Sequence, residues 1–484
     1  MQSILFYLVP AIPFAFGLCF LLVRRVPMKV AGVGLVLSFA AMVMLAITGD
    51  GVQPVFSVAP DVHFIFRSDA AGRLFGLLFA AMFTVAGFFS FPYFKHYENP
   101  AWFYAFYFFS LFALLCLSMA GSLLTVYLCF ETLTLCSFPM VLFDKTKEAV
   151  AAAVKYMLYS ISGAMMGLLG VIYLTLHTTS ATFVAGGSLE AALIESPPWL
   201  LLPILFICMI GFGTKAGLFP MHGWLPTAHP IAPSPASAVL SGVIVKAGVL
   251  CIFRIIYFAA GTEILRGTWV QTALLSLSLL TVLIGSAQAL RQKHIKRRLA
   301  YSTVSQISYI LFGLFLLNGE AASGALLHTV FHSIMKTCLF LCAGAIMVQT
   351  GNADVDKMQG IGKKMPITMW CFTLAGVGLV GIPPLSGFLS KWYLAQGAVQ
   401  SGIGVFSWLG PVVLLVSALL TAGYILPVSI SAFFPGRQAQ VLEIREAPAG
   451  MTVPLMLLAG LTLLLGLYSI PLRNAITAIL QTLL

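Results

Sequence analysis

The dominant feature of the sequence is a series of apolar segments, each close to the length that crosses the hydrocarbon core of a bilayer as an α-helix. We count about 14 of them, each near the roughly 20 residues that a span requires, and they begin near residues 4, 30, 73, 103, 123, 150, 199, 236, 270, 300, 322, 367, 409 and 451. Composition agrees, since 60% of the residues are hydrophobic, 8% are charged and the mean hydropathy is +1.00. These values exclude a water-soluble globule, so the sequence predicts an all-α polytopic membrane protein.

Basic residues indicate how the chain is oriented in the membrane. When the loop after the first segment is placed inside, most of the 26 Lys and Arg residues fall in inside connections, as is typical of short cytoplasmic loops. This predicts a multi-pass protein of a bacterial or archaeal cell (inner) membrane with both termini outside, and a first segment that is retained and not cleaved. The net charge of +11 then needs no nucleic-acid partner. We interpret the basic run 291–298 as an anchor near anionic lipid, with a docking surface for a cytoplasmic partner as the alternative.

Two lysines lie at hydrocarbon depth around a proline-rich stretch. Lys215 stands near the end of one apolar segment and Lys246 inside the next, and five prolines lie between them. A Lys near the centre of a membrane helix costs about 2.5 to 3.5 kcal/mol on insertion scales. Because proline cannot continue a regular helix, the first segment should break near residues 217–220. A broken helix beside a buried amine is typical of ion sites in transporters.

Glu131 is the only carboxylate in the middle of an apolar segment. An isolated carboxylate there would become neutral by taking up a proton, so an ionised Glu131 requires a cationic partner within a few ångström. A static structural ion pair is one interpretation. A proton relay is the other, and the several lysines retained in apolar segments favour it.

The second half of the chain repeats the pattern. His328, His332 and Lys336 are spaced at i, i+4 and i+8, so they line one helix face as groups that can exchange protons. Further on, Pro383, Pro384 and Gly387 precede Lys391, which again places a helix break beside an amine. Corresponding interrupted segments in two halves predict an inverted-repeat transporter with its path at the midplane.

Five ordered motifs now carry a resemblance. They are Met-His-Gly-Trp-Leu-Pro-Thr-Ala-His at 221–229, the Ala-Pro-Ser-Pro-Ala-Ser-Ala turn at 232–238, Ile-Lys-Arg-Arg-Leu-Ala-Tyr-Ser at 295–302, the His/His/Lys series at 328–336 and Gly-Phe-Leu-Ser-Lys at 387–391. Over residues 69–435 the chain resembles the antiporter-like membrane subunits. That family is shared by respiratory complex I, membrane-bound hydrogenases, formate hydrogenlyases and multi-subunit sodium/proton antiporters.

The resemblance implies a fold and a set of roles. The fold would be 14 helices with two inverted five-helix repeats, 101–260 and 261–435, flanked by membrane segments in 1–100 and 436–484. Glu131 and Lys215 would interact in the first half-channel, with Lys155 also facing Glu131, and Lys246 would be the central lysine. His328, His332 and Lys336 would form a bridge to Lys391, the terminal proton donor, and we add His222 as a supporting group. Many family members have Asp where this chain has Thr227, which departs from the pattern in the Trp-Leu-Pro turn.

No cofactor is expected in this chain. The sequence has no flavin fingerprint and no Walker loop, and its nine cysteines lie in apolar segments without a CxxC pair. Redox chemistry would therefore belong to peripheral subunits on the cytoplasmic side, and the other expected partners are further membrane subunits, including antiporter-like ones, and lipids. Three functions stay open: a proton-translocating subunit of an energy-converting complex, a subunit of a sodium/proton secondary antiporter, and a scaffold with a non-conducting ion path.

Overall fold

The structure is a computed structural model that describes residues 2–23, 26–59, 62–95, 97, 100–195, 197–436 and 444–483. The first part of the chain forms α1 (Gln2–Leu22), α2 (Met28–Thr48), β1 (Gly51–Ala59), β2 (Val62–Ser68), α3 (Ala70–Tyr93), α4 (Ala101–Ser118), α5 (Leu123–Val141), α6 (Lys147–His177) and α7 (Ala191–Glu195). The middle part forms α8 (Leu201–Ala216), α9 (Leu225–Ile231), α10 (Ser234–Val239), the π-helix η1 (Leu240–Ile244), α11 (Val245–Arg254), the π-helix η2 (Ile255–Ala260) and α12 (Trp269–Arg291). The last part forms α13 (Ile295–Phe315), α14 (Gly319–Thr350), the short 3-10 helices η3 (Val355–Lys357) and η4 (Ile361–Lys363), α15 (Pro366–Val380), α16 (Ser386–Gln400), α17 (Phe406–Phe433), α18 (Ala449–Leu467) and α19 (Ile470–Gln481).

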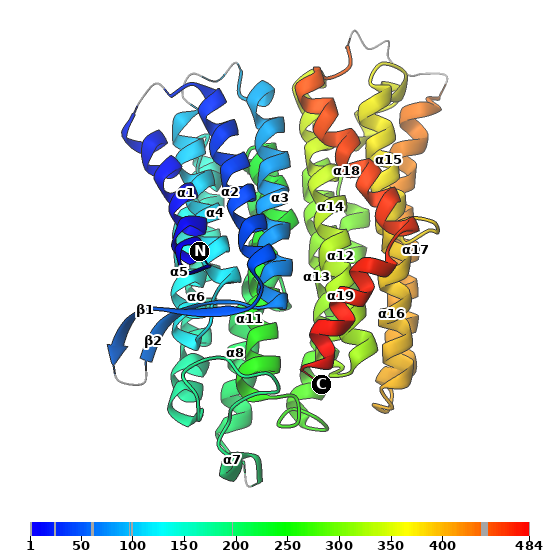
Figure 1. The fold of residues 1–484 in the computed structure, drawn as a ribbon. Coiled ribbons are helices and arrows are strands. Elements are labelled where there is room, and N and C mark those ends of the chain that lie inside the picture. Colours follow the sequence, from blue (N-terminus) through cyan, green and yellow to red (C-terminus); the bar gives the residue numbers. More distant parts are fainter. Residues whose placement is uncertain are drawn as a thin grey trace.

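The long helices run side by side in one bundle, and neighbours along the chain mostly run in opposite directions (Figure 1). Helices α1 to α6 form one side of the bundle in this view, and α12 to α18 form the other. Within the described residues, 11 helices are long and apolar enough to cross a membrane, and α10, η1, α11 and η2 together form one of them, Ser234–Ala260. The prediction of a mainly helical, multi-pass membrane protein is confirmed.

Two apolar helices are shorter than a span, and both end at a glycine. Helix α8 ends before Gly217 and α15 ends before Gly381, and both glycines have the left-handed conformation, with φ of 77° and 91°. This conformation favours glycine, which has no Cβ, and it is common just after the last turn of a helix. After each break the chain resumes as a further helix, α9 or α16. The predicted interruptions after Lys215 and before Lys391 are confirmed.

The prediction of a chain built only from helices is wrong in one place. Strands β1 and β2 pair antiparallel as a hairpin that projects to one side of the bundle (Figure 1). Val, Ile and Phe recur along residues 52–66, and β-branched and aromatic residues favour strands. The segment is too short and too interrupted by polar residues to span as a helix, so a search for apolar segments of about 20 residues passes over it.

An ion-pair cluster fastens this hairpin to the bundle. Asp69 caps the N-terminus of α3 by accepting a hydrogen bond from the Gly72 amide, at 2.7 Å. Its carboxylate also accepts hydrogen bonds from Nη1 and Nη2 of the fully buried Arg254, at 2.6 and 2.8 Å. Nε of Arg67 lies 3.2 Å from the same carboxylate. Burial by itself raises the pKa of Asp69, but Arg254, the Gly72 amide and Arg67 outweigh it and hold that pKa below its usual value.

Two long helical segments lie wholly in the interior of the bundle. Every residue of Ser234–Ala260 is buried, and so is every residue from 321 to 346 in α14. Because helix centres inside a bundle meet neither lipid nor bulk water, charged groups on these segments must be satisfied by other side chains or backbone. Lys246, His328, His332 and Lys336 of the candidate path lie on these two segments.

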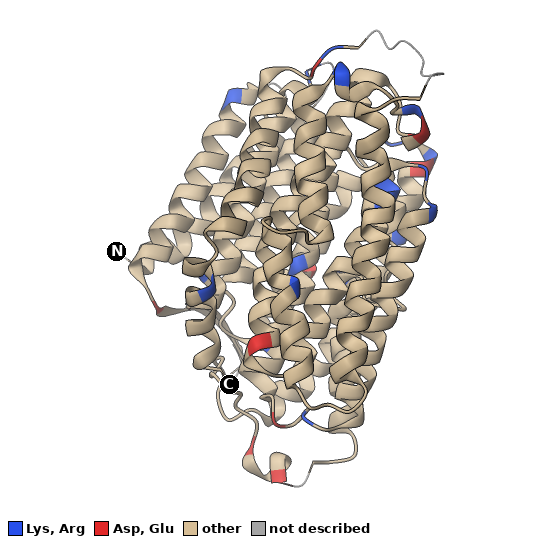
Figure 2. Cartoon of the chain, turned by 90° about the vertical axis from the view of Figure 1, so that its right-hand side faces the viewer, with Lys and Arg blue, Asp and Glu red and all other residues tan. Residues whose placement is uncertain are grey.

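Charged residues are distributed unevenly over the bundle. Lys and Arg gather at the end drawn at the top of Figure 2, whereas the marked chain ends lie further down. This arrangement agrees with basic connections that share one side of the membrane. The side that faces the cytoplasm remains a prediction.

Candidate ion path

Lys215 occupies a buried cage at the end of α8. Its amine donates hydrogen bonds to Thr134 Oγ1 at 2.7 Å and to the Tyr156 hydroxyl at 3.3 Å, and lies 5.0 Å from the centre of the Phe130 ring. The Tyr156 ring in turn packs on Trp224, with 4.6 Å between ring centroids. The two hydroxyl groups and the aromatic rings offset part of the desolvation cost of the buried amine, but none of them carries a negative charge that would neutralise it.

Glu131 lies on the same helix as Thr134 but does not contact Lys215 directly. Among the described residues no ion pair within 4.0 Å includes Glu131, and its Oε1 is buried without a hydrogen-bond partner. The predicted neighbour Lys155 hydrogen-bonds to Thr227 at 3.1 Å, the position at which this chain departs from the family pattern. The structure thus places Glu131 in α5, Lys155 in α6 and Lys215 at the end of α8, with no ion pair among these three residues.

Lys246 and His332 form the central contact of the site. The Lys246 amine lies 2.7 Å from Nδ1 of His332, and it donates a second hydrogen bond to the Ser241 carbonyl at 2.8 Å. Both side chains are fully buried. Ser241 belongs to the π-helix η1, and single π-turns are frequent at functional sites because they re-aim backbone and side-chain groups. His332 Nε2 is buried without a hydrogen-bond partner within the described part of the chain.

His328 continues the series toward the second helix break. Its ring centroid lies 5.7 Å from that of His332. Its Nε2 lies 3.1 Å from Gln306 Oε1 and its Nδ1 lies 2.9 Å from the Ser390 hydroxyl. Because a neutral imidazole has one donating and one accepting nitrogen, these two contacts hold the His328 ring in place, and their donor and acceptor roles follow its tautomer.

Lys391 sits at the break between α15 and α16. Its amine donates to the carbonyl oxygens of Leu379 and Val380, at 2.7 and 2.9 Å, which are the last carbonyls of α15. It also lies 5.1 Å from the centre of the Tyr309 ring, and that ring stacks on His328 with 5.7 Å between centroids. The second broken helix therefore presents its free carbonyls to a lysine, as the sequence predicts.

Lys336 points away from this series. Its amine donates to the Ser302 hydroxyl at 2.7 Å and to the Leu299 carbonyl at 3.0 Å, and Ser302 is bonded to the Tyr424 hydroxyl at 2.8 Å. His222 is separate too. It stacks on Phe219, with 5.8 Å between ring centroids, and its Nδ1 is buried without a partner in the described chain.

We call Lys246, His332, His328 and Lys391 the buried row. Its neighbours are joined by a hydrogen bond, by ring proximity or through the shared Tyr309 ring. No hydrogen bond between described residues joins the Lys215 cage to this row. The structure therefore brings the predicted residues together in two groups and leaves a step between the groups.

The sequence analysis missed two buried titratable groups. Lys296, interpreted as part of a basic loop, is 2% exposed and donates to the Ala232 carbonyl at 2.6 Å. His229 is fully buried and stacks on Phe340, with neither ring nitrogen hydrogen-bonded among the described residues. The available signal for each residue was its place in one of the five motifs, at 295–302 for Lys296 and at 221–229 for His229.

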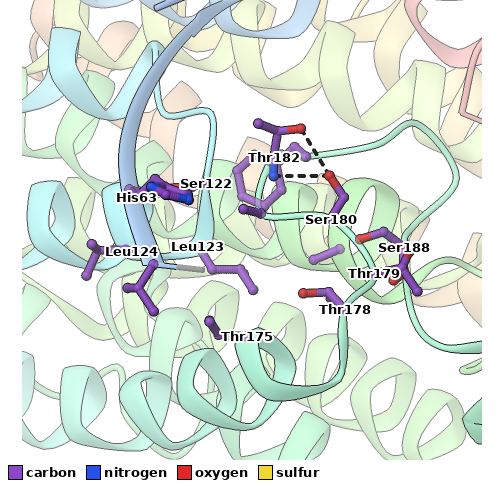
Figure 3. A pocket seen from close by; sticks show the side chains of 14 residues that line it. His63, Ser122, Leu123, Leu124, Thr175, Thr178, Thr179, Ser180, Thr182 and Ser188 are labelled. Atoms are coloured by element: carbon purple, nitrogen blue, oxygen red, sulfur yellow. Dashed lines mark hydrogen bonds between the residues drawn. The ribbon is translucent and has the colours of Figure 1, made fainter. Parts of the chain in front are cut away.

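A small polar cavity of about 110 Å³ lies beside the β-hairpin (Figure 3). Its lining includes His63 and the hydroxyl-bearing residues Ser122, Thr175, Thr178, Thr179, Ser180, Thr182 and Ser188. The Ser180 hydroxyl lies 3.1 Å from that of Thr182. None of the predicted relay residues lines this cavity, so it is separate from the path.

The cysteines form no cluster that resembles a metal centre. All nine are free thiols, seven of them buried, and the described residues contain no group of three or more His, Cys, Asp and Glu side chains placed to hold a metal ion.

Comparison with known proteins assigns the family. A family described as "NADH:quinone oxidoreductase/Mrp antiporter, TM" matches residues 120–421. NADH-quinone oxidoreductase subunit N of Desulforudis audaxviator is 36% identical over 386 residues, which cover 76% of this chain and 74% of that protein. A Na(+)/H(+) antiporter subunit of Alkalihalophilus pseudofirmus is 29% identical over 408 residues, which cover 84% and 81% of the two chains.

The fold matches as well. A chain of the membrane-bound sulfane sulfur reductase, an archaeal respiratory membrane complex, is similar with a TM-score of 0.86 and 23% identity, and the match covers 100% of this chain and 97% of that one. The resemblance drawn from the five motifs is confirmed. The chain belongs to the NADH:quinone oxidoreductase/Mrp antiporter family of antiporter-like membrane subunits.

Proposed function

We propose that this protein is the proton-translocating, antiporter-like subunit of a multi-subunit energy-converting membrane complex. The observation that carries the proposal is the contact between Lys246 and His332, at 2.7 Å, inside two fully buried helical segments. Burying a lysine against a histidine forms no salt bridge and removes both groups from water. The contact therefore stabilises the fold too little to offset the desolvation of the two side chains, which argues against a purely structural role. Both groups can hold or release a proton, and that property explains why they lie together.

The buried row supplies the steps of a relay. A proton on Lys246 can pass to Nδ1 of His332, from the imidazole of His332 toward His328, and from there toward Lys391 at the break of α15. The free carbonyls that hold the Lys391 amine stabilise its protonated form. Lys336, linked through Ser302 to Tyr424, and His222, just before α9, would act as branches that supply protons to the row.

Glu131 and Lys215 would control the first half-channel. In this structure the Lys215 ammonium is held by Thr134 and Tyr156, and Glu131 retains an unpartnered oxygen. Bringing the carboxylate to Lys215 would favour the protonated lysine, and separating them would favour transfer of its proton toward Lys246. Lys155 competes for Glu131 and is now bound to Thr227, so the acid has two alternative bases. The step from Lys215 to Lys246 would run through water.

The finer organisation of the fold belongs to the same proposal. We place two inverted five-helix repeats at 101–260 and 261–435, within 14 spans, with 1–100 and 436–484 as flanking segments. Two breaks of the same kind, at Gly217 and at Gly381, support this division. Both termini would face outward and the basic connections would face the cytoplasm.

The partners follow from the relatives. The chain would assemble with further antiporter-like membrane subunits and with peripheral redox subunits on the cytoplasmic side, which would hold the redox cofactors, and it would hold none itself. Sodium/proton exchange is the second candidate, because a Na(+)/H(+) antiporter subunit is among the relatives. A scaffold role is the third, and it is the weakest because the buried row would then be without purpose.

Reconstitution of the purified complex in proteoliposomes tests the proposal. A pH-sensitive dye inside the vesicles reports proton movement, and radioactive sodium reports sodium movement. Lys246→Ala should abolish proton movement with the complex still assembled, whereas Lys147→Ala, which changes an exposed lysine at the start of α6, should leave it unchanged. Proton movement at the normal rate in Lys246→Ala would overturn the relay. If Lys246→Ala abolishes sodium uptake together with proton release, the result would favour the sodium/proton antiporter.

A further inference from the structure

A second cavity lies between α14, α16 and α19, and none of the predicted relay residues lines it. Its volume is about 570 Å³, and its lining combines the start of α14, the end of α16 and one side of α19. The polar lining residues are Asn318, Glu320, Ser323, Gln400, Arg473, Thr477 and Gln481. A cavity of this size and polarity holds a group much larger than a single water molecule.

Two opposite charges face this cavity without contacting each other. Glu320 in α14 and Arg473 in α19 both line it, and no ion pair within 4.0 Å joins them or either of them to another described residue. The Arg473 guanidinium lies 4.5 Å from the centre of the Tyr393 ring, and the Ser323 hydroxyl is buried without a hydrogen-bond partner in the described chain. The site therefore offers a cation, an anion and a spare hydroxyl to one occupant.

The cavity continues into an apolar groove along α16. This groove, of about 340 Å³, is lined by Trp392, Ala395, Gln396, Val399 and Gln400, and Gln400 also lines the polar cavity. Trp392 and Val399 are 57% and 62% exposed, so the groove lies on the outer surface of the helix. The polar cavity and the apolar groove together suit an amphiphile, with its headgroup in the cavity and an apolar chain in the groove.

The polar cavity lies near an end of the bundle. It combines the start of α14 with the end of α16, and helices that span a membrane begin and end near its surface. Helix α19 has 12 residues, too few to span a bilayer core, and it buries Ile476, Ile479 and Leu480 against the bundle. In Figure 1 it descends from α18 toward the C mark at the lower end of the bundle.

We propose that this site binds a phospholipid with a primary amine in its headgroup, of the phosphatidylethanolamine class. Arg473 takes the phosphate, Glu320 accepts hydrogen bonds from the ammonium, and one acyl chain lies along Trp392 and Val399. A phosphatidylglycerol headgroup would offer Glu320 only neutral hydroxyls in place of an ammonium, and a phosphatidylcholine headgroup has no N–H to donate to it. The two opposite charges thus favour a zwitterionic headgroup whose ammonium carries N–H donors.

Native mass spectrometry of the purified full chain and of the assembled complex tests the site. Delipidated samples receive phosphatidylethanolamine, phosphatidylcholine or phosphatidylglycerol with identical acyl chains, and the retained lipid is counted. We expect one phosphatidylethanolamine to be retained preferentially by both samples. Equal retention of the three lipids, or preference for phosphatidylglycerol, would overturn the proposal. Retention by the chain alone and not by the complex would overturn it too, because another subunit would then fill the site.

Variants separate the two ends of the headgroup. Arg473→Gln should weaken retention of phosphatidylethanolamine by about tenfold or more, as expected when a charge-assisted hydrogen bond is lost. Glu320→Gln should remove the preference over phosphatidylcholine while some binding persists. Val399→Trp should block the groove and reduce retention of all three lipids. Arg291→Gln, which changes an exposed arginine at the end of α12 outside this site, is the matched control. Unchanged lipid selectivity in both charge variants would contradict the assignment, provided that the variants elute as monodisperse protein.

Discussion

The amine of Lys246 lies 2.7 Å from Nδ1 of His332, so a lysine of the segment 234–260 and a histidine of α14 share one hydrogen bond in the most buried part of the bundle. Either group can carry the shared proton, because imidazole accepts at one nitrogen while it donates at the other. The second nitrogen of His332 has no hydrogen-bond partner among the described residues, which leaves it available to the next group.

His332→Gln tests this contact. Glutamine can still hydrogen-bond to Lys246, but its amide does not exchange protons near neutral pH, so the complex should assemble while proton movement falls on the order of tenfold or more. Dye-based transport in proteoliposomes measures the fall. His177→Gln, near the end of α6, is the control and should transport normally. A His332→Gln complex that transports at the normal rate would show that protons bypass this histidine.

Glu131→Gln tests the first half-channel. The substitution keeps the size of the side chain and removes the only carboxylate in the middle of a membrane helix among the described residues, so Lys215 loses its acidic counterpart. We expect most proton movement to disappear with a normal yield of complex. Glu148→Gln, at the exposed start of α6, supplies the comparison. Full transport by Glu131→Gln would remove Glu131 from the mechanism.

Lys391 allows a scaffold to be distinguished from a proton donor. Lys391→Arg keeps a cation that can donate to the Leu379 and Val380 carbonyls, but arginine does not release its proton at physiological pH. We therefore expect an assembled but inactive complex for Lys391→Arg, and loss of both activity and some yield for Lys391→Ala. Activity is measured as proton pumping per assembled complex. Normal pumping in Lys391→Arg would mean that Lys391 serves only to cap α15.

Asp69→Asn tests the cluster that holds the hairpin. Asparagine can still cap α3, but it leaves the fully buried Arg254 without a counter-charge, and breaking such a pair destabilises by about 3 to 5 kcal/mol. The pKa of Asp69 is held below its usual value, so its contribution is complete at neutral pH and is lost as the pH falls through that lowered pKa, below about 4. Thermal unfolding in detergent should show a lower melting temperature at about pH 7 and a smaller difference in acid. Asp50→Asn, whose side chain is 75% exposed, should change little.

Labelling of single cysteines tests the orientation. Lys293→Cys, in a connection at the basic end, should react with a membrane-impermeant reagent only from the cytoplasmic side, and Glu190→Cys, before α7, only from the outside. Intact and inverted vesicles provide the two sides. The nine native thiols are at least partly buried, so a cysteine-containing parent is a usable background. Reaction of both positions from the same side would contradict the predicted topology.

The sequence by itself determined the class of the protein and the chemistry available to it. Long apolar segments leave no alternative to membrane helices, because backbone groups in lipid must be satisfied within the segment. Prolines and glycines near residues 217 and 381 determined where two helices end, since they act through local backbone geometry. Glu131, Lys215, Lys246 and Lys391 were conspicuous because charged residues are expensive in hydrocarbon wherever the helix lies.

Only the tertiary structure decided which of these groups meet. The partners of Lys215 come from α5 and α6, those of His328 from α13 and α16, and such pairings depend on helix packing that no local pattern encodes. Packing also separated Glu131 from Lys215, buried Lys296 in spite of its basic neighbours, and turned Lys336 toward Tyr424 and away from the row. Spacing along one helix fixes a shared face, but the direction of each side chain on that face depends on the helices packed against it.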